Sequence, residues 1–322
     1  MAVFLLLFAG GAIFVFAATV YVFRLALLRR PPPDYSQKAV QKNTPVGKYG
    51  DRLAACAKAF DALEAETVHI QSFDGLRLCG KLFTAENPRG VLVLMHGYHS
   101  CPGIDFGCAA DFLLHELHLH LLFAQQRAHG ESEGDYITFG VRERFDCRDW
   151  ARYAAARFGE RLPILLYGLS MGGATVLMAS GLALPDNVAG IVADCGFTTP
   201  RAIFTHVLRR GLHLPRWPFL PLFGLFCRWF AGFDMDGAST LDALAKNDRP
   251  VLLIHGENDD FVPMEMSLQN YAACRGEKML LTVKGAAHGL SYLVEEAACK
   301  AEIAAFMELC LREKQLEMQK DL

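Results

Sequence analysis

The residues with the clearest chemical potential lie in one short stretch, residues 168–172, which read Gly-Leu-Ser-Met-Gly and fit the pattern Gly-x-Ser-x-Gly. An apolar run at residues 164–167 precedes it and is short enough for a buried strand. A serine on a sharp strand-to-helix turn projects its hydroxyl out of the sheet, and glycines two positions away leave room for the chain to reverse. The stretch makes Ser170 a candidate nucleophile, although this pattern alone also occurs by chance.

A serine hydroxyl becomes a good nucleophile only when a base removes its proton and a third group orients that base. On a strand-turn-helix scaffold these partners follow in the order Ser, Asp or Glu, His. A pair of aspartates follows an apolar run at residues 251–254, and His288 follows another apolar run at residues 279–283. Each therefore lies just past the carboxyl end of an expected strand, where open α/β sheets place their catalytic residues.

Six short motifs follow one another along the chain. They are Met-His-Gly-Tyr at 95–98, Arg-Ala-His-Gly-Glu-Ser-Glu-Gly at 127–134, Gly-Leu-Ser-Met-Gly-Gly at 168–173, Asp-Cys-Gly-Phe at 194–197, His-Gly-Glu-Asn-Asp at 255–259 and Gly-Ala-Ala-His at 285–288. In these motifs and their order the chain resembles the α/β-hydrolase superfamily, and within it the membrane-anchored bacterial hydrolases of the serine aminopeptidase-like group. Six motifs in order are far more specific than any one of them. The resemblance covers about residues 66–312 and implies Ser170 as nucleophile, His288 as base and Asp259 as orienting acid.

The orienting acid has two rivals in the sequence. In the family's His-Gly-x-x-Asp turn the first carboxylate is the acid, which favours Asp259 over Asp260. Asp194 is the other rival, because some hydrolases of this fold place the acid after an earlier strand. The turn at residues 255–259 matches better, so Asp259 is the expected acid.

The same resemblance implies an oxyanion hole made of two backbone N–H groups. By position these belong to Tyr98, in the loop after the strand at residues 91–95, and to Met171, next to the nucleophile. Two fixed donors would stabilise the transition state by several kcal/mol, since the loss of one donor costs about 3 kcal/mol in other enzymes. His96, in the first of these loops, is expected to brace the loop rather than to act as a base.

The expected reaction is acyl transfer to water through an acyl-enzyme, with no metal and no organic cofactor. The superfamily carries a cap over the site at residues 197–240, and the aromatic side chains of this segment favour a hydrophobic ester or a lipid-like acyl substrate. Peptidases and acyltransferases use the same triad, so both stay alternatives, as does a membrane-anchored binding protein without turnover. The histidines of residues 115–120 lack the His-Glu-x-x-His spacing, so we expect no metal site there.

The elements that would position these residues alternate between strands and helices. Residues 68–83 alternate around an Asp-Gly pair, which predicts a hairpin. Further strands are expected near residues 91–95, 121–124, 164–167, 188–193, 251–254 and 279–283, with a surface helix at 141–158 and a final amphipathic helix at 295–314. The fold class is therefore α/β, and the resemblance implies an α/β-hydrolase fold: a mostly parallel central sheet, helices on both faces and a small helical cap.

One position departs from the family pattern. The family commonly has an aspartate two residues before the arginine at position 127, where this chain has Gln125. Gln125 cannot form the ion pair with Arg127 that an aspartate could form, but it is not part of the proposed triad.

The first residues predict a membrane anchor. Residues 2–23 contain no charged side chain, and about 20 apolar residues suffice for a helix that crosses a bilayer. A cleaved signal peptide usually has positive residues before a shorter apolar core, which this chain lacks. We therefore expect a transmembrane anchor at residues 1–28, a linker and amphipathic helix at residues 29–65, and the hydrolase domain at residues 66–322, with an acyl substrate and the membrane as partners.

Charge predicts the orientation and excludes nucleic acid as a partner. Basic residues follow the apolar segment and none precedes it, so the positive-inside rule places the catalytic domain on the cytoplasmic side. The ten cysteines are scattered without a Cys-x-x-Cys pair, which is typical of buried small hydrophobic residues rather than of a disulfide framework. A net charge of −3 without a basic patch argues against nucleic acid.

Overall fold

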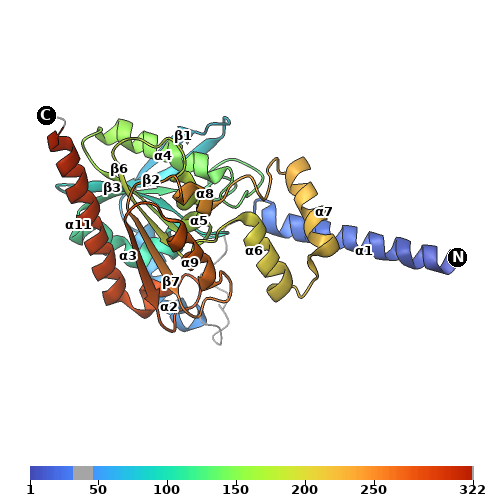
Figure 1. Ribbon diagram of the computed structural model, residues 1–322. Helices are drawn as coiled ribbons and strands as arrows, with labels where there is room; N and C mark the ends of the chain where they lie inside the picture. The colour runs from blue at the N-terminus through green and yellow to red at the C-terminus, as the bar shows by residue number, and fades with distance from the viewer. Residues whose placement is uncertain (32–45, 321–322) are drawn as a thin grey trace.

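An eight-stranded sheet forms the centre of the computed structural model, which describes residues 1–31 and 46–320 (Figure 1). The strands lie in the order β1-β2-β4-β3-β5-β6-β7-β8; β2 pairs antiparallel with β1 and β4, and all other neighbours pair parallel. The sheet is therefore mostly parallel, as expected. The strands are β1 (Glu66–Gln71), β2 (Arg77–Phe83), β3 (Gly90–Met95), β4 (Leu119–Ala124), β5 (Ile164–Leu169), β6 (Val188–Asp194), β7 (Val251–Gly256) and β8 (Lys278–Val283).

Helices cover both faces of this sheet, and a separate group of helices projects from its edge (Figure 1). The helices and helical turns are α1 (Ala2–Leu27), η1 (Val46–Tyr49), α2 (Gly50–Asp61), α3 (Pro102–Asp111), η2 (Phe112–Glu116), α4 (Glu143–Phe158), α5 (Met171–Ala179), α6 (Pro200–His206), η3 (Val207–Gly211), α7 (Arg216–Trp229), α8 (Thr240–Leu244), α9 (Met264–Ala273), α10 (Ser291–Val294) and α11 (Glu296–Lys320).

The central strand β3 shows why continuous apolar runs form this sheet. Val91, Val93 and Met95 point to one face, where they share a core with α4 and α5. Leu92 and Leu94 point to the opposite face, where they share a core with α2, α3 and α11. A parallel strand covered on both faces buries every side chain, so its sequence reads as a run rather than an alternation. The expected strands are confirmed on this basis.

The hairpin of β1 and β2 and the helix α4 that packs on it were both predicted. A turn at Asp74 and Gly75 joins β1 to β2, which confirms the hairpin. The predicted helix at residues 141–158 is α4, which packs one face on the sheet: Trp150 is fully buried over β2. A Cβ atom added at Gly80 would lie 2.9 Å from the Trp150 ring, so the glycine makes room for the indole.

A disulfide corrects the prediction made from the cysteines. Cys56 of α2 is bonded to Cys108 of α3, and it ties the expected amphipathic helix to the domain. The physical reason is that α2 packs directly on α3, which brings together two cysteines 52 residues apart. The other cysteines are free thiols and all but Cys101 are buried, as predicted.

The cap segment leaves the sheet after β6 as α6, η3 and α7, and α1 lies alongside α7 (Figure 1). Phe23 of α1 makes edge contacts with Phe223 and Phe226 of α7 and with Phe230 directly after that helix, at centroid distances of 5.8 to 6.2 Å. Residues 7–14 of α1 are exposed. The stretch Leu7–Leu27 is long and apolar enough to cross a membrane. The predicted linker falls mostly at residues 32–45, outside the described residues.

Candidate active site

Ser170 occupies the sharp turn between β5 and α5. Its backbone lies at φ 55° and ψ −114°, a conformation that is strained for a residue with a side chain. The flanking glycines are sterically required, because a Cβ at Gly168 would lie 2.0 Å from the carbonyl oxygen of Gly172, and a Cβ at Gly172 would lie 1.8 Å from that of Met95. This turn directs the serine hydroxyl away from the sheet, as the sequence pattern predicts.

The structure brings Ser170, His288 and Asp259 together in one line of hydrogen bonds. The Nε2 atom of His288 lies 2.9 Å from the Oγ atom of Ser170. On the other side of the ring, Nδ1 lies 2.7 Å from the Oδ2 atom of Asp259. The neighbouring Asp260 is exposed, and its backbone carbonyl accepts a hydrogen bond from His206. Such a chain can move a proton from the serine to the imidazole while the carboxylate stabilises the resulting charge.

The surroundings of Asp259 keep its carboxylate ionised. Burial opposes ionisation, but hydrogen bonds from His255 and His288 outweigh it and lower the pKa of Asp259 to about 2. The Oδ1 atom also accepts the backbone N–H groups of Phe261 and Val262, at 3.0 and 2.8 Å. An anionic acceptor next to Nδ1 favours the tautomer in which Nε2 is free to accept the serine proton.

Asp194, the rival acid, lies at the end of β6 but makes different contacts. Burial raises the pKa of its carboxyl to about 6, which disfavours a permanent anion. Its side chain meets the hydroxyl of Ser291 at 3.5 Å, and its backbone carbonyl accepts the N–H of Ser170 at 2.8 Å. Asp194 therefore supports the backbone of the nucleophile turn, whereas Asp259 contacts the imidazole.

The family assignment comes from comparison with known proteins. The model of the prolyl oligopeptidase family matches residues 136–314, more than half of the chain. The chain belongs to the prolyl oligopeptidase family. This match includes the segment that contains Ser170, Asp259 and His288.

Solved structures confirm the fold. The Pyrococcus furiosus esterase Pf2001 aligns with a TM-score of 0.63 at 21% identity, covering 88% of this chain and 98% of that chain. Est1E from Butyrivibrio proteoclasticus, solved with ferulic acid bound, aligns with a TM-score of 0.55 at 19% identity, covering 76% and 99%. The chain is thus an α/β-hydrolase, as the sequence motifs predicted, and the family and fold support a serine hydrolase.

Similar sequences include an uncharacterised protein and a lipase. YqkD of Bacillus subtilis is 25% identical over 251 residues, which cover 78% of this chain and 82% of YqkD. The lysophosphatidylserine lipase ABHD12 of Danio rerio is 26% identical over 215 residues, which cover 62% of this chain and 50% of the lipase.

Of the two expected oxyanion donors, the backbone N–H of Tyr98 lies in the loop after β3, and that of Met171 belongs to the first residue of α5, directly after the nucleophile. Among the described residues, neither N–H donates a hydrogen bond to a protein acceptor. The preceding residue Gly97 is close to the serine, since a Cβ added there would lie 3.5 Å from the Cβ of Ser170. Both N–H groups are therefore available to a ligand.

Asp105 contacts the loop after β3, and sequence reasoning missed it. It lies half-buried on α3, and its carboxyl accepts the N–H of Gly97 at 2.6 Å and the hydroxyl of Ser100 at 2.5 Å. Burial raises the pKa of Asp105 to about 6, against the lowering effect of these two hydrogen bonds. The carboxyl fixes the loop that carries Tyr98. The available signal was an aspartate in the first turn of a helix directly after that loop.

His96 braces the same loop, as expected. Its Nε2 atom accepts the backbone N–H of Gln126 at 3.0 Å, and its Nδ1 atom lies 2.8 Å from the carbonyl oxygen of Gly97. Both contacts fit a neutral ring. Burial lowers the pKa of His96 to about 3, so the ring stays neutral near pH 7.

Arg127 finds other partners in place of the aspartate that this chain lacks. Its guanidinium contacts the buried carboxylate of Asp146 on α4 at 2.6 Å and that of Asp74 at 2.9 Å. Arg127 therefore forms ion pairs with Asp146 and Asp74, which lie farther away in the sequence than position 125. These contacts tie the loop after β4 to α4 and to the β1–β2 turn.

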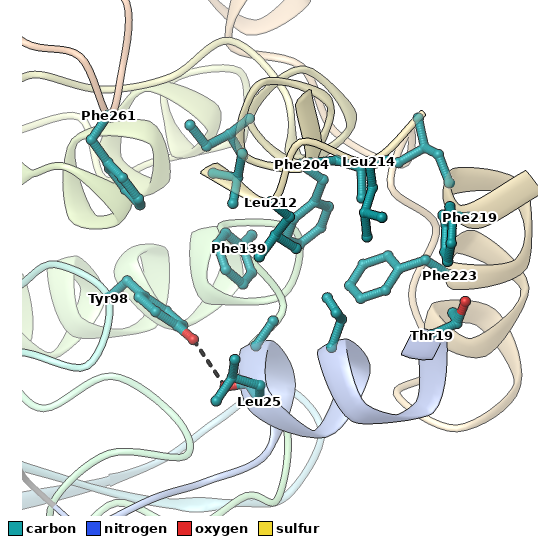
Figure 2. A pocket seen from close by; sticks show the side chains of 16 residues that line it. Thr19, Leu25, Tyr98, Phe139, Phe204, Leu212, Leu214, Phe219, Phe223 and Phe261 are labelled. Atoms are coloured by element: carbon teal, nitrogen blue, oxygen red, sulfur yellow. Dashed lines mark hydrogen bonds between the residues drawn. The ribbon is translucent and has the colours of Figure 1, made fainter. Parts of the chain in front are cut away.

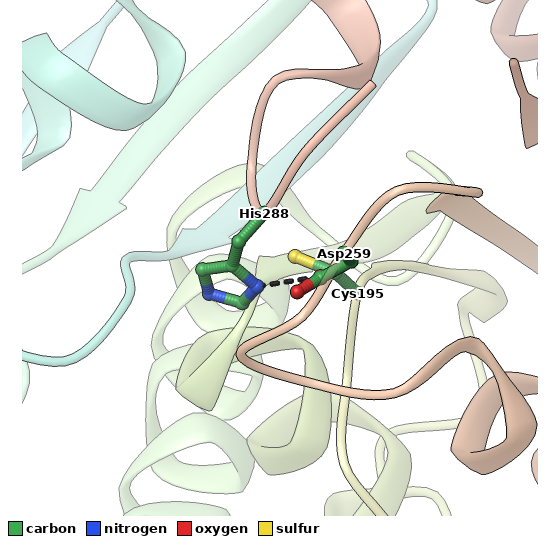
Figure 3. A group of neighbouring side chains, drawn as sticks. All are labelled: Cys195, Asp259 and His288. Carbon is green, nitrogen blue, oxygen red and sulfur yellow. Dashed lines mark hydrogen bonds and ion pairs between the residues drawn. The ribbon is translucent and has the colours of Figure 1, made fainter. Parts of the chain in front are cut away.

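The buried thiol of Cys195 lies beside the carboxylate of Asp259 and the imidazole of His288 (Figure 3). Its sulfur and the nearest ligand atoms of Asp259 and His288 lie within 4.8 Å of one another. Burial raises the pKa of the Cys195 thiol well above its usual range, so the sulfur is protonated and a poor metal ligand. His288 and Asp259 also point at each other rather than at a common centre. This cluster therefore does not fit a metal ion.

Proposed function

We propose that this protein hydrolyses an ester of a hydrophobic acyl group with Ser170 as nucleophile, His288 as general base and Asp259 as orienting acid. The observation that carries the proposal is the unbroken chain of contacts from Ser170 Oγ to His288 Nε2 and from His288 Nδ1 to Asp259. The strained turn at Ser170 and the free N–H groups of Tyr98 and Met171 support it as well.

The proposed reaction has two half-reactions. Ser170 attacks the ester carbonyl carbon while His288 takes the serine proton, and the N–H groups of Tyr98 and Met171 stabilise the oxyanion. When the tetrahedral intermediate collapses, the C–O bond breaks and His288 gives its proton to the leaving alcohol. A water molecule, deprotonated by His288, then attacks the acyl-enzyme, releases the acid and restores the serine hydroxyl.

An acyl ester is favoured over a peptide by the charges of the cap. A peptidase that grips a free amino terminus needs a carboxylate available near the site. The two carboxylates of the cap, Asp234 and Asp236, are paired with Arg228 and Arg201, and Arg201 meets Asp236 at 2.6 Å. The sequence similarity to a lysophosphatidylserine lipase points in the same direction. A peptidase is the second candidate, because the matching family is that of prolyl oligopeptidases.

Turnover of matched ester and amide substrates tests the proposal. We expect the wild type to hydrolyse p-nitrophenyl butyrate and Ser170→Ala to lose this activity. A proline-containing peptide p-nitroanilide should be hydrolysed with a far lower kcat/KM. A higher kcat/KM for the anilide would make the protein a peptidase, and an added alcohol that becomes the main acyl acceptor would make it an acyltransferase. A folded wild type that turns over neither substrate would favour a binding protein.

We also propose that residues 1–28 anchor the domain in a membrane, followed by a linker and an amphipathic helix at residues 29–65. The length and composition of Leu7–Leu27 support the anchor. The cysteines no longer support a cytoplasmic domain, because disulfides such as Cys56–Cys108 persist mainly in oxidising compartments. The cytoplasmic orientation therefore rests on the basic residues after the span alone. Protease digestion of sealed inside-out and right-side-out membrane vesicles tests it: a cytoplasmic domain is cleaved only in inside-out vesicles.

A further inference from the structure

We propose that α1 is part of the substrate site as well as an anchor: it forms one wall of a groove that receives the long alkyl chain of an acyl ester from the bilayer. This inference rests on the proposed ester hydrolysis and adds the substrate class and the route of entry.

The groove is an apolar cavity of about 190 Å³ between α1, the cap and the loops of the active site (Figure 2). In Figure 2, Tyr98 and Phe261 lie at one end, and Thr19, Phe219 and Phe223 lie at the other. A row of aromatic rings connects the two ends. The rings are Tyr98 and Phe139, 5.1 Å apart, then Phe204, 4.5 Å from Phe139, then Phe223, 4.9 Å from Phe204.

One end of the groove adjoins the proposed catalytic residues. The ring of Phe261 lies 4.9 Å from the ring of His288. Tyr98, whose N–H is a proposed oxyanion donor, also lines the groove, and its hydroxyl donates a hydrogen bond to the carbonyl oxygen of Leu25 at 3.2 Å. This bond attaches α1 to the oxyanion loop. A chain that extends from the reacting carbonyl can therefore enter the groove directly.

The other end of the groove reaches the depth of the lipid. The stretch of α1 that is long and apolar enough to cross a membrane, Leu7–Leu27, includes residues 15–27, which pack on the cap. At 1.5 Å per residue this stretch is about 30 Å long, as thick as the hydrocarbon layer, so a membrane-spanning α1 also places part of its contact with the cap in lipid. The exposed aromatic residues Trp217 and Trp229 of α7, and Phe230 directly after it, suit such an interfacial position.

The lining fits an alkyl chain rather than a polar ligand. No charged side chain lines the groove among the described residues, and its polar side chains are Thr19 and Tyr98. Both hydroxyls already donate to backbone carbonyls of α1, that of Thr19 to Val15 at 2.7 Å and that of Tyr98 to Leu25. A peptide in this groove would leave its buried N–H and C=O groups without partners, which is costly, whereas an alkyl chain has no such groups.

A chain-length comparison in the full-length protein tests this inference. Ala26 lines the groove, so Ala26→Trp should fill it, whereas Ala17 is exposed on the same helix and Ala17→Trp is the matched control. The readout is the ratio of kcat/KM for p-nitrophenyl palmitate to that for p-nitrophenyl acetate, both presented with phosphatidylcholine vesicles. We expect the ratio to fall by about tenfold or more in Ala26→Trp, which corresponds to displacing about two methylene groups, and to stay unchanged in Ala17→Trp.

The outcomes separate this inference from the proposed function. An unchanged ratio in Ala26→Trp, or an equal fall in Ala17→Trp, overturns the role of α1 even if the acetate is hydrolysed normally. Fluorophosphonate labelling reports whether each variant has a folded site; if Ala26→Trp fails to label, Leu212→Trp fills the same groove from the cap and carries the test. A wild type that neither hydrolyses the acetate nor takes up the label overturns the proposed function, and this inference with it.

Discussion

Replacement of Asp259 by asparagine should abolish most of the activity while changing few atoms. The Oδ1 position can still accept the N–H groups of Phe261 and Val262, as it does in the wild type. The new NH₂ group then faces Nδ1 of His288, which must become an acceptor. The ring proton moves to Nε2, the atom that lies 2.9 Å from Ser170, so the ring can no longer take the serine proton.

The magnitude of this effect follows from the role of the carboxylate. The corresponding substitution in serine proteases lowers kcat by about 10⁴-fold, or about 5.5 kcal/mol in activation free energy, and we expect a similar loss in Asp259→Asn. We expect a smaller loss of folding stability than of activation free energy. The pKa of Asp259 falls from 3.8 to about 2, which corresponds to about 2 kcal/mol of folding stability at neutral pH. Because this pKa is depressed, the contribution is present above about pH 4 and is lost as the pH falls toward 2.

The assay is the steady-state hydrolysis of p-nitrophenyl acetate by the wild type and three Asp→Asn variants. Asp260→Asn is the exposed neighbour control and Asp194→Asn is the buried control, and both should keep kcat within about tenfold of the wild type. Urea unfolding at pH 7 and pH 3 measures the contribution of the Asp259 carboxylate to the free energy of unfolding. A loss smaller than tenfold in Asp259→Asn, or an equal loss in Asp194→Asn, would refute the assignment of the acid.

Three further predictions concern the surroundings of the site. Asp105→Asn should lower kcat by about ten- to a hundredfold with little change in KM for p-nitrophenyl acetate, because it weakens an acceptor that holds the loop of the proposed donor Tyr98; an unchanged kcat would contradict this positioning role. Arg127→Met should lower the free energy of unfolding by about 3 to 5 kcal/mol in urea titrations, because it leaves Asp146 buried without its partner. Reduction of Cys56–Cys108 should cost about 2 to 4 kcal/mol by the same measurement, and an unchanged urea midpoint would count against the bond in solution.

The sequence predicted most of what depends on local geometry. The turn at Ser170 can be recognised because only glycine fits at positions 168 and 172, where a side chain would collide with backbone oxygens. The positions of Asp259 and His288 could be anticipated because residues that follow parallel strands meet at one edge of the sheet. The buried strands could be located because a sheet covered on both faces requires continuous apolar runs.

The contacts that sequence reasoning missed join distant segments and leave no local pattern. Asp105 contacts Gly97 only because α3 begins directly after the loop that carries Gly97 and Tyr98. Arg127 depends on Asp146 and Asp74, and neither is near it in the sequence. The packing of α1 on the cap had no signal either, since an apolar helix suited to lipid is equally suited to a row of phenylalanines.

Labelling of the purified full-length protein with a fluorophosphonate probe tests the central claim most directly. The wild type and Ser170→Ala are treated side by side, and the labelled residue is identified by mass spectrometry. The proposed triad predicts a covalent adduct on Ser170 in the wild type and none in the variant. A folded wild type that takes up no label, or a label on any residue other than Ser170, would contradict it.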